Sequence, residues 1–266
     1  MENTHLGKSS PYIDTYSPEL LVAIERAPIR NQLGINTTKM KGIDIWNHWE
    51  VSYLSSTGKP EIACLSLTYD GMSPCIVESK SLKLYFNSLN QAKFSSTNEL
   101  LNTVTTDIEA TVKSSVKVEV LNDSCLQTDW INDYLCLDDI EAEFCDYSPA
   151  PDYLAVTDAI VTEKLCSHLF KTNCMVTGQP DWASVFIEYK GNQIDRVGLL
   201  KYLVSFRNHQ AFHEPSCEMI FSDLLERCQL EQLSVYCRYT RRGGIDINPY
   251  RSTQSSVPHN YRILRQ

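Results

Sequence analysis

Apolar and polar residues follow two different periods along the first third of this chain, which separates expected strands from expected helices. Residues 46–54 and 62–69 are rich in aromatic and β-branched side chains. A turn of the Gly–Pro type at 57–60 lies between them, so we predict a β-hairpin. Residues 79–89 then predict a short helix.

A second helix and a further strand follow this hairpin. Ser96 and Glu99 have the spacing of a capping box, and apolar residues recur at helical spacing from 100 to 112. Valines at alternate positions over 116–120 are separated by charged residues, which is typical of a half-buried strand. The order is therefore strand, strand, helix, helix, strand.

The same order returns later in the chain. A hairpin is expected over 164–189, a first helix around 199–206 and a second helix that Pro215 opens in its first turn. Residues 234–239 predict a closing strand. The sequence thus predicts an α+β fold of two similar modules, each an antiparallel sheet with helices packed on one face.

Direct sequence repeats support this duplication. Residues 57–61 read TGKPE and 177–181 read TGQPD, an offset of 177 − 57 = 120. Leu82 and Lys83 match a Leu–Lys pair at 200–201, an offset of 200 − 82 = 118. At the offset of 120, Cys174 corresponds to Leu54. At the offset of 118, residues 195–198 match none of residues 77–80, and His213 and Glu214 correspond to two serines. Reactive residue types gained and lost in complementary places predict one composite site, although neutral drift explains many such differences.

The repeat divides the chain into four expected segments. Residues 1–40 form an N-terminal extension, 41–127 the first module, 128–151 an acidic linker and 152–266 the second module. Trp130, Tyr134 and Leu135 in the linker suggest that it packs on the protein. The polar tail from residue 252 is expected to be loose.

Composition limits the classes of function. The 266 residues carry a formal net charge of −9, which disfavours a broad tRNA- or DNA-binding surface. The ten cysteines are scattered and form no CxxC pair, and the first residues lack the apolar run of a signal peptide. No segment has the length and apolarity of a membrane span. We therefore expect a cytoplasmic protein with reduced thiols.

Cys174 is the first candidate for chemistry. It lies at the foot of the second Gly–Pro turn, outside any apolar run, and a thiolate attacks carbonyl or nitrile carbon readily. The alternative is a buried structural thiol. Asp181 follows across the turn, where burial and a neighbouring thiolate would raise its pKa and let it donate a proton. Its alternative role is a turn cap, as the acid of TGKPE suggests.

His213 and Glu214 form a second candidate pair. Together they could deliver a proton and anchor a heterocycle through its N–H groups. The alternative for Glu214 is an acid favoured at a helix N-terminus. His209 and His213 have the spacing of two metal ligands on a helix, but Pro215 places them at a helix junction, so we expect no metal.

The sequence RRGG at 241–244 is expected to end the last strand. Arg242 and Gly243 within it suit a phosphate group, because arginine pairs with phosphate and glycine lets it approach backbone N–H groups. A solvated strand end is the alternative. The chain has neither a GxGxxG nor a Walker pattern.

With these residues, the sequence resembles the two-module form of the NADPH-dependent 7-cyano-7-deazaguanine reductases. The resemblance rests on the hexapeptide ESKSLK at 78–83 together with Cys174-x6-Asp181, and it extends to four further segments: 6–8, 16–24, 212–214 and 239–250. It implies the tunnelling fold, association into a homodimer and the reduction of a deazapurine nitrile to an amine in queuosine synthesis.

The resemblance also implies roles for individual residues. Cys174 would add to the nitrile carbon as a covalent thioimide, Asp181 would supply a proton with His213 beside it, and two NADPH would be used without a metal. The remaining implied contacts are with the base for Val77, Glu78, Ser79, His213 and Glu214, and with NADPH for Ser79, Lys80, Arg242 and Gly243.

Two other functions remain open from the residues alone. One is a pterin- or purine-type cyclohydrolase on the same fold, which would hydrolyse its substrate and usually need zinc. The other is a non-catalytic module that binds tRNA or a protein partner, against which the acidic net charge counts.

Overall fold

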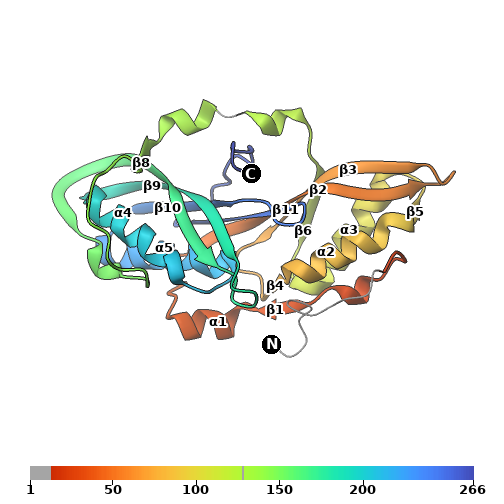
Figure 1. Ribbon diagram of the computed structural model, residues 1–266, viewed down its shortest axis with the longest axis horizontal. Helices are drawn as coiled ribbons and strands as arrows, with labels where there is room; N and C mark the ends of the chain where they lie inside the picture. Colours follow the sequence, from red (N-terminus) through yellow and green to blue (C-terminus); the bar gives the residue numbers. More distant parts are fainter. Residues whose placement is uncertain (1–12, 128) are drawn as a thin grey trace.

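A long curved β-sheet runs through the molecule (Figure 1). The computed structural model describes residues 13–127 and 129–266. The sheet has nine strands, in the order β6-β3-β2-β11-β10-β9-β8-β7, and β5 pairs with β2 beside this path. The pairings of β2 with β5 and of β7 with β8 are parallel, and the other neighbours in this sheet are antiparallel.

The first module has the predicted order of elements. Its hairpin and closing strand form one half of the sheet, and two helices cover one face. These elements are β2 (Lys41–Ser55), β3 (Pro60–Asp70), β4 (Cys75–Val77), α2 (Ser79–Ser88), β5 (Lys93–Phe94), α3 (Thr97–Val112) and β6 (Val116–Val120). The hairpin, both helices and the strand predicted here are confirmed.

The second module repeats this arrangement. Its elements are β8 (Val156–Asn173), β9 (Pro180–Ile194), α4 (Arg196–Ser205), α5 (His213–Cys228), β10 (Gln232–Tyr239) and β11 (Ile245–Ser252). Pro215 lies in the first turn of α5, as predicted, where no intrahelical N–H bond is lost. The α+β fold with helices on one face of an antiparallel sheet is confirmed.

Short segments complete the fold outside the two modules. The extension and linker contribute β1 (Ala23–Glu25), α1 (Arg26–Leu33) and β7 (Leu135–Cys136). Turns of 3-10 helix occupy Pro18–Leu20, Leu89–Gln91, Asp123–Leu126, Asp129–Asp133, Pro151–Tyr153 and Phe206–Asn208. The boundaries predicted for the four segments of the chain stay predictions.

The two modules also share individual contacts. The Tyr85 hydroxyl donates to Asp107 at 2.6 Å, and the Tyr202 hydroxyl donates to Asp223 at 2.6 Å. Each bond ties the first helix of its module to the second. Helices α2 and α4 begin at positions 79 and 196, an offset of 196 − 79 = 117, and not the predicted 118.

This corrected offset changes which residues correspond. Glu78 is the counterpart of Asp195, and both are helix N-caps, so the acid is shared rather than confined to the first module. The Glu78 carboxylate accepts from the backbone N–H groups of the second and third helical residues, each at 2.8 Å. The predicted absence of a matching acid in the second module was therefore wrong, because the loops lost one more residue than the alignment assumed.

The capping box of α3 differs in one detail from the prediction. Ser96 caps the helix and accepts from the Glu99 N–H at 3.2 Å, as expected. The Glu99 carboxylate accepts from the Ser95 N–H at 2.7 Å, one residue before the cap. The box is thus one residue wider than the sequence pattern predicted.

Strand β11 joins the two modules, which the sequence analysis missed. The last strand was expected to end at Arg241, but the chain turns and returns as β11, which pairs with β10 and with β2. The expectation of a loose tail from residue 252 was also wrong. Ile263 and Gln266 are buried, and Gln266 Oε1 accepts from Arg238 Nε at 2.9 Å.

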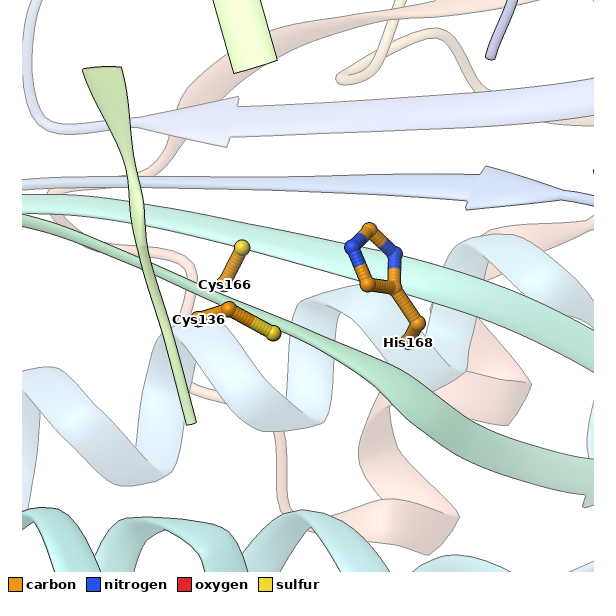
Figure 2. A group of neighbouring side chains, drawn as sticks. All are labelled: Cys136, Cys166 and His168. Carbon is orange, nitrogen blue, oxygen red and sulfur yellow. The ribbon is translucent and has the colours of Figure 1, made fainter. Parts of the chain in front are cut away.

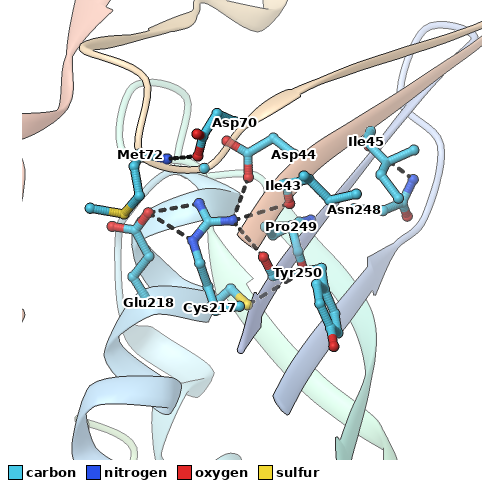
Figure 3. Close-up of polar contacts among 12 residues, drawn as sticks. Ile43, Asp44, Ile45, Asp70, Met72, Cys217, Glu218, Asn248, Pro249 and Tyr250 are labelled. Carbon is cyan, nitrogen blue, oxygen red and sulfur yellow. Dashed lines mark hydrogen bonds and ion pairs between the residues drawn. The ribbon is translucent and has the colours of Figure 1, made fainter. Parts of the chain in front are cut away.

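A buried ion network reinforces the junction of the modules (Figure 3). Arg251 of β11 pairs with Asp44 of β2 at 2.8 Å and with Glu218 of α5 at 2.7 Å. Arg26 and Arg30 of α1 pair with the same two carboxylates. Removing one partner of such a pair leaves a buried charge and typically costs about 3–5 kcal/mol.

The two faces of the sheet have separate apolar cores. The helices cover one face, and the linker crosses the other (Figure 1). Trp130 and Tyr134 of the linker pack on Phe186 with ring centroids 4.7 and 5.1 Å away, so the predicted packing of these two residues is confirmed. These contacts add aromatic area to the helix-free face.

Candidate active site

A pocket at the junction of the modules gathers most of the predicted site residues. Figure 1 places the tip of the β8–β9 hairpin beside β4, in the middle of the molecule. Its lining residues are Trp46, Ile76, Val77, Ser79, Cys174, Asp181, Ala211, Phe212, His213, Glu214, Arg242 and Ile247. Both modules contribute side chains to it. That these residues form one composite site stays a prediction.

Cys174 lies directly after β8, in the turn that leads into β9. Its N–H donates to the Gln179 carbonyl at 2.8 Å, and its carbonyl accepts from the Gly178 N–H at 2.9 Å. Gly178 has φ +67°, a conformation that favours glycine. The thiol is 8% exposed and lines the pocket, so it belongs to the pocket wall rather than to either main core cluster.

The turn also revises the counterpart of Cys174. In the first module the Ser55 N–H donates to the Lys59 carbonyl at 2.8 Å, the bond that Cys174 makes with Gln179. Ser55 therefore corresponds to Cys174, and the predicted match with Leu54 was wrong. The second turn spans 179 − 174 = 5 residues against 59 − 55 = 4 in the first, which accounts for the shift.

Asp181 is held by two cationic partners at the start of β9. Its Oδ1 lies 2.5 Å from Arg242 Nη1, and its Oδ2 lies 3.4 Å from His213 Nε2. Burial raises the pKa of Asp181, but the hydrogen bond and charge of His213 and the charge of Arg242 outweigh it, and the net pKa is lowered. The predicted raised pKa was wrong, because sequence could not place these partners beside the carboxylate.

His213 is the first residue of α5 and is partly exposed to the pocket. Its ring packs on Tyr239 with centroids 3.9 Å apart, which fixes the direction in which Nε2 meets Asp181. His209 precedes the helix and is absent from the pocket lining, so the two histidines do not share a helix face. The expectation that this pair does not bind a metal stays a prediction.

Glu214 is buried at 2% exposure, and its Oε1 has no hydrogen-bond partner among the residues described. Burial, with the charge of Asp44 as the second cause, raises the pKa of Glu214 to about 8. The carboxyl group is therefore largely protonated at neutral pH. A buried polar atom without a partner, at the wall of a pocket, is suited to bind a ligand.

Glu78 lies beside the pocket but is not part of its lining. Val77 and Ser79 on either side line it, while the Glu78 carboxylate caps α2. The predicted contact of Glu78 with a ligand stays a prediction.

Cationic groups stand at the rim of the pocket. Arg242 lines it and also bonds Gln179, and its guanidinium interacts with the Cys174 sulfur. Gly243 has φ +61°, and a Cβ there would lie 3.1 Å from Lys83 Cδ. Lys83 was missing from the predicted site although it ends ESKSLK; burial, followed by the charge of Arg242, lowers its pKa. Lys80 and Gly243 do not line the pocket.

These cations suit the phosphates of a dinucleotide. Arginine and lysine pair with phosphate oxygens, and the left-handed glycine leaves room beside Lys83. The contacts predicted for Ser79, Lys80, Arg242 and Gly243 stay predictions.

Among the described residues, no helix has the length and apolarity needed to cross a membrane.

Comparison with known proteins identifies the family. Residues 12–120 match the family described as nitrile reductase, 7-cyano-7-deazaguanine-reductase N-term, and residues 180–258 match the family described as QueF-like protein. An NADPH-dependent 7-cyano-7-deazaguanine reductase of Legionella pneumophila (strain Lens) is 49% identical, over 99% of this chain and 95% of its own. A protein of the same name from Delftia acidovorans is 45% identical, over 100% of this chain and 99% of its own. The chain belongs to the family of NADPH-dependent 7-cyano-7-deazaguanine reductases.

Proposed function

We propose that this protein reduces the nitrile group of 7-cyano-7-deazaguanine to a primary amine with NADPH. The net reaction consumes two NADPH and two protons and gives the aminomethyl base and two NADP⁺. The observation that carries the proposal is the presence of a thiol, a carboxylate and an imidazole in one pocket between the modules. Family membership supports the substrate, since the relatives are named for this reaction.

The first step assigned to the protein is addition of Cys174 to the nitrile carbon. A nitrile has no leaving group, so addition of the thiolate gives a covalent thioimide and nothing is released. The Arg242 guanidinium interacts with this sulfur, and the thiolate is the attacking form of a cysteine. The nitrile nitrogen must gain a proton as the carbon–sulfur bond forms.

We assign that proton to the pair of Asp181 and His213. The net pKa of Asp181 is lowered, and its carboxylate lies 3.4 Å from His213 Nε2, so the imidazole is placed to pass on the proton. Asp181 then acts through His213, and both residues are needed to deliver the proton.

We assign recognition of the guanine-like edge to Glu214, with Glu78, Val77 and Ser79 beside it. The Oε1 atom of Glu214 can accept an N–H bond from the base. Accepting it favours the ionised form, so substrate binding is expected to release a proton from Glu214 near neutral pH. Substrate recognition and ionisation of this carboxyl are thus coupled.

NADPH, when bound, supplies the hydrides of the reduction. The residues proposed to hold it are Ser79, Lys80, Lys83, Arg242 and Gly243. Lys83 and Arg242 would pair with its phosphates, and the pocket wall would exclude water from the reacting carbon.

We also propose that the active protein is a cytoplasmic homodimer without a catalytic metal. The resemblance to the two-module reductases implies the dimer, and the ten free thiols are compatible with a reducing compartment.

The test is a stoichiometric assay with purified protein. Mixing the protein with 7-cyano-7-deazaguanine and excess NADPH should oxidise two NADPH per molecule of amine formed. A hydrolytic product without NADPH oxidation would favour a cyclohydrolase, and binding without any product would favour a non-catalytic module.

A further inference from the structure

Three side chains of types that commonly bind metals lie close together on the helix-free face of the second module, away from the pocket. Figure 2 shows Cys136 of β7 beside Cys166 and His168 of β8. One ligand atom from each lies within 4.8 Å of the others. The parallel pairing of β7 with β8 sets Cys136 opposite Cys166, and residues 166 and 168 share one face of their strand.

The imidazole is already oriented for coordination. His168 Nδ1 lies 2.7 Å from the Ser184 hydroxyl, which leaves Nε2 for a further partner. Figure 2 shows one ring nitrogen turned toward the two thiols. Histidines that bind metals usually bond an oxygen through their second nitrogen in this way.

Asp138 supplies a further support on the same side. Its carboxylate accepts from the Ser167 hydroxyl at 2.7 Å and from the His168 N–H at 3.0 Å. It also bonds the Cys136 thiol. A carboxylate in this position fixes two of the three ligand-bearing residues and adds negative charge for a cation.

We propose that Cys136, Cys166 and His168 bind a zinc ion. Two thiolates and one imidazole match the preference of Zn²⁺ for sulfur and nitrogen ligands in a tetrahedral arrangement, and they do not suit Mg²⁺ or Ca²⁺. A water molecule or the Asp138 carboxylate completes the fourth position. Asp138 bonds residues of both strands, so this position needs no large movement of the backbone.

The zinc would have a structural role. Cys166 precedes Cys174 by eight residues on the same extended segment, which corresponds to roughly 25 Å. The ion would join the linker strand β7 to β8. The pairing of these two strands otherwise consists of only two residue pairs. It is therefore separate from the proposed reaction, in which no metal takes part.

The test uses the full chain with Cys174→Ala, so that zinc cannot bind the thiol in the pocket. The protein is reduced, stripped with a chelator and titrated with Zn²⁺ against a chromogenic chelator, and separately with Co²⁺. One zinc per chain is expected, together with the thiolate-to-cobalt absorption of a tetrahedral site. Cys136→Ser and His168→Ala should each weaken the affinity by more than about 100-fold, and Ser184→Ala by about 10- to 100-fold.

Cys145→Ser is the matched control, because Cys145 is an exposed thiol of the same linker outside the cluster. It should leave the affinity unchanged. The proposal would be overturned by a reduced protein that takes up no zinc, by uptake that survives Cys136→Ser with His168→Ala, or by a Cys136–Cys166 disulfide in a protein that stays metal-free after reduction.

Discussion

The two modules are built alike, and they differ most at the turn of their first hairpin. In the first module the Ser55 hydroxyl accepts from the Lys59 N–H at 3.2 Å and bonds Thr57 at 3.0 Å, so it closes its own turn. In the second module the turn is one residue longer, and the Cys174 side chain lines the pocket instead. A small change in turn length thus turns a structural position toward the pocket.

The acid that opens the following strand differs in the same sense. Glu61 is partly exposed and pairs with Lys59 at the surface. Its counterpart Asp181 is 4% exposed and lies between Arg242 and His213. An exposed pair of this kind adds little to stability, whereas the buried one fixes two side chains of the pocket.

The N-terminus of the second helix also differs between the two modules. Ser96 caps α3 with its side chain, but Phe212 stands at the N-cap of α5 and has no acceptor to offer. Behind Phe212, the buried Glu214 carries an Oε1 atom with no partner among the described residues. The second module therefore has less local stabilisation at the helix end that faces the pocket.

The largest expected effect is loss of the thiol. Cys174→Ala should reduce NADPH oxidation with the nitrile to below about one thousandth of the wild-type rate, because the covalent step is lost. Ser55→Ala, the matched change in the first module, should leave the rate within about twofold. Steady-state absorbance assays of both variants compare the modules directly, and a Cys174→Ala protein that stays active would refute the proposed chemistry.

The next effect concerns the two acids of the hairpins. Asp181→Asn should slow formation of the adduct by about 100-fold to 10,000-fold, since delivery of a proton is impaired. Glu61→Gln should change neither adduct formation nor turnover. Stopped-flow absorbance measures the adduct, and equilibrium binding of the nitrile to Asp181→Asn separates the proton role from affinity. Equal losses in rate and in binding would argue for a purely structural Asp181.

The third effect depends on pH. The folded-state pKa of Glu214 is about 8 against 4.5 in its ordinary state, so the folded protein binds the extra proton between these values. Stability from this group is present below pH 4.5 and is lost as the pH rises through 8. Glu214→Gln should therefore be more stable than the wild type at pH 9, by on the order of 5 kcal/mol, and similar to it at pH 4.

Urea unfolding at the two pH values measures this difference. The same variant should bind the base more weakly at both, because the amide cannot become an anion. A stability difference that does not change with pH would contradict a buried, neutral Glu214.

The smallest effect compares the two helix caps. Glu78→Ala and Asp195→Ala each remove a cap and should each lower the free energy of unfolding by about 1 kcal/mol. Glu78→Ala should in addition raise the KM for the nitrile, while Asp195→Ala should leave it unchanged. If both variants keep the wild-type KM, Glu78 is a cap and nothing more.

Local patterns made much of the fold predictable. Gly–Pro turns, alternating valines and apolar residues at helical spacing located the hairpins and helices, and the repeat indicated two similar modules. Strand β11 was not predicted because Pro249 and the charged Arg251 lie within it, and such residues normally argue against a central strand. Asp44 and Glu218 neutralise Arg251 there, but they are distant in sequence.

The residues of the candidate site could be predicted from the sequence better than their ionisation states. Cys174, His213 and Glu214 were found from residue type and position, and Lys83 could have been found from its place in ESKSLK. The ionisation of Asp181 could not, since it depends on Arg242, which is 61 residues away in the chain. Sequence offsets cannot show which way a loop folds back.

The central claim is that one thiol, in the second module, bonds the substrate carbon. Intact-protein mass spectrometry of the wild type mixed with 7-cyano-7-deazaguanine, without NADPH, tests it most directly. The account predicts a mass gain of one whole substrate molecule, which peptide mapping assigns to Cys174 and which added NADPH removes. An unchanged mass, or an adduct on another of the ten cysteines, would contradict it.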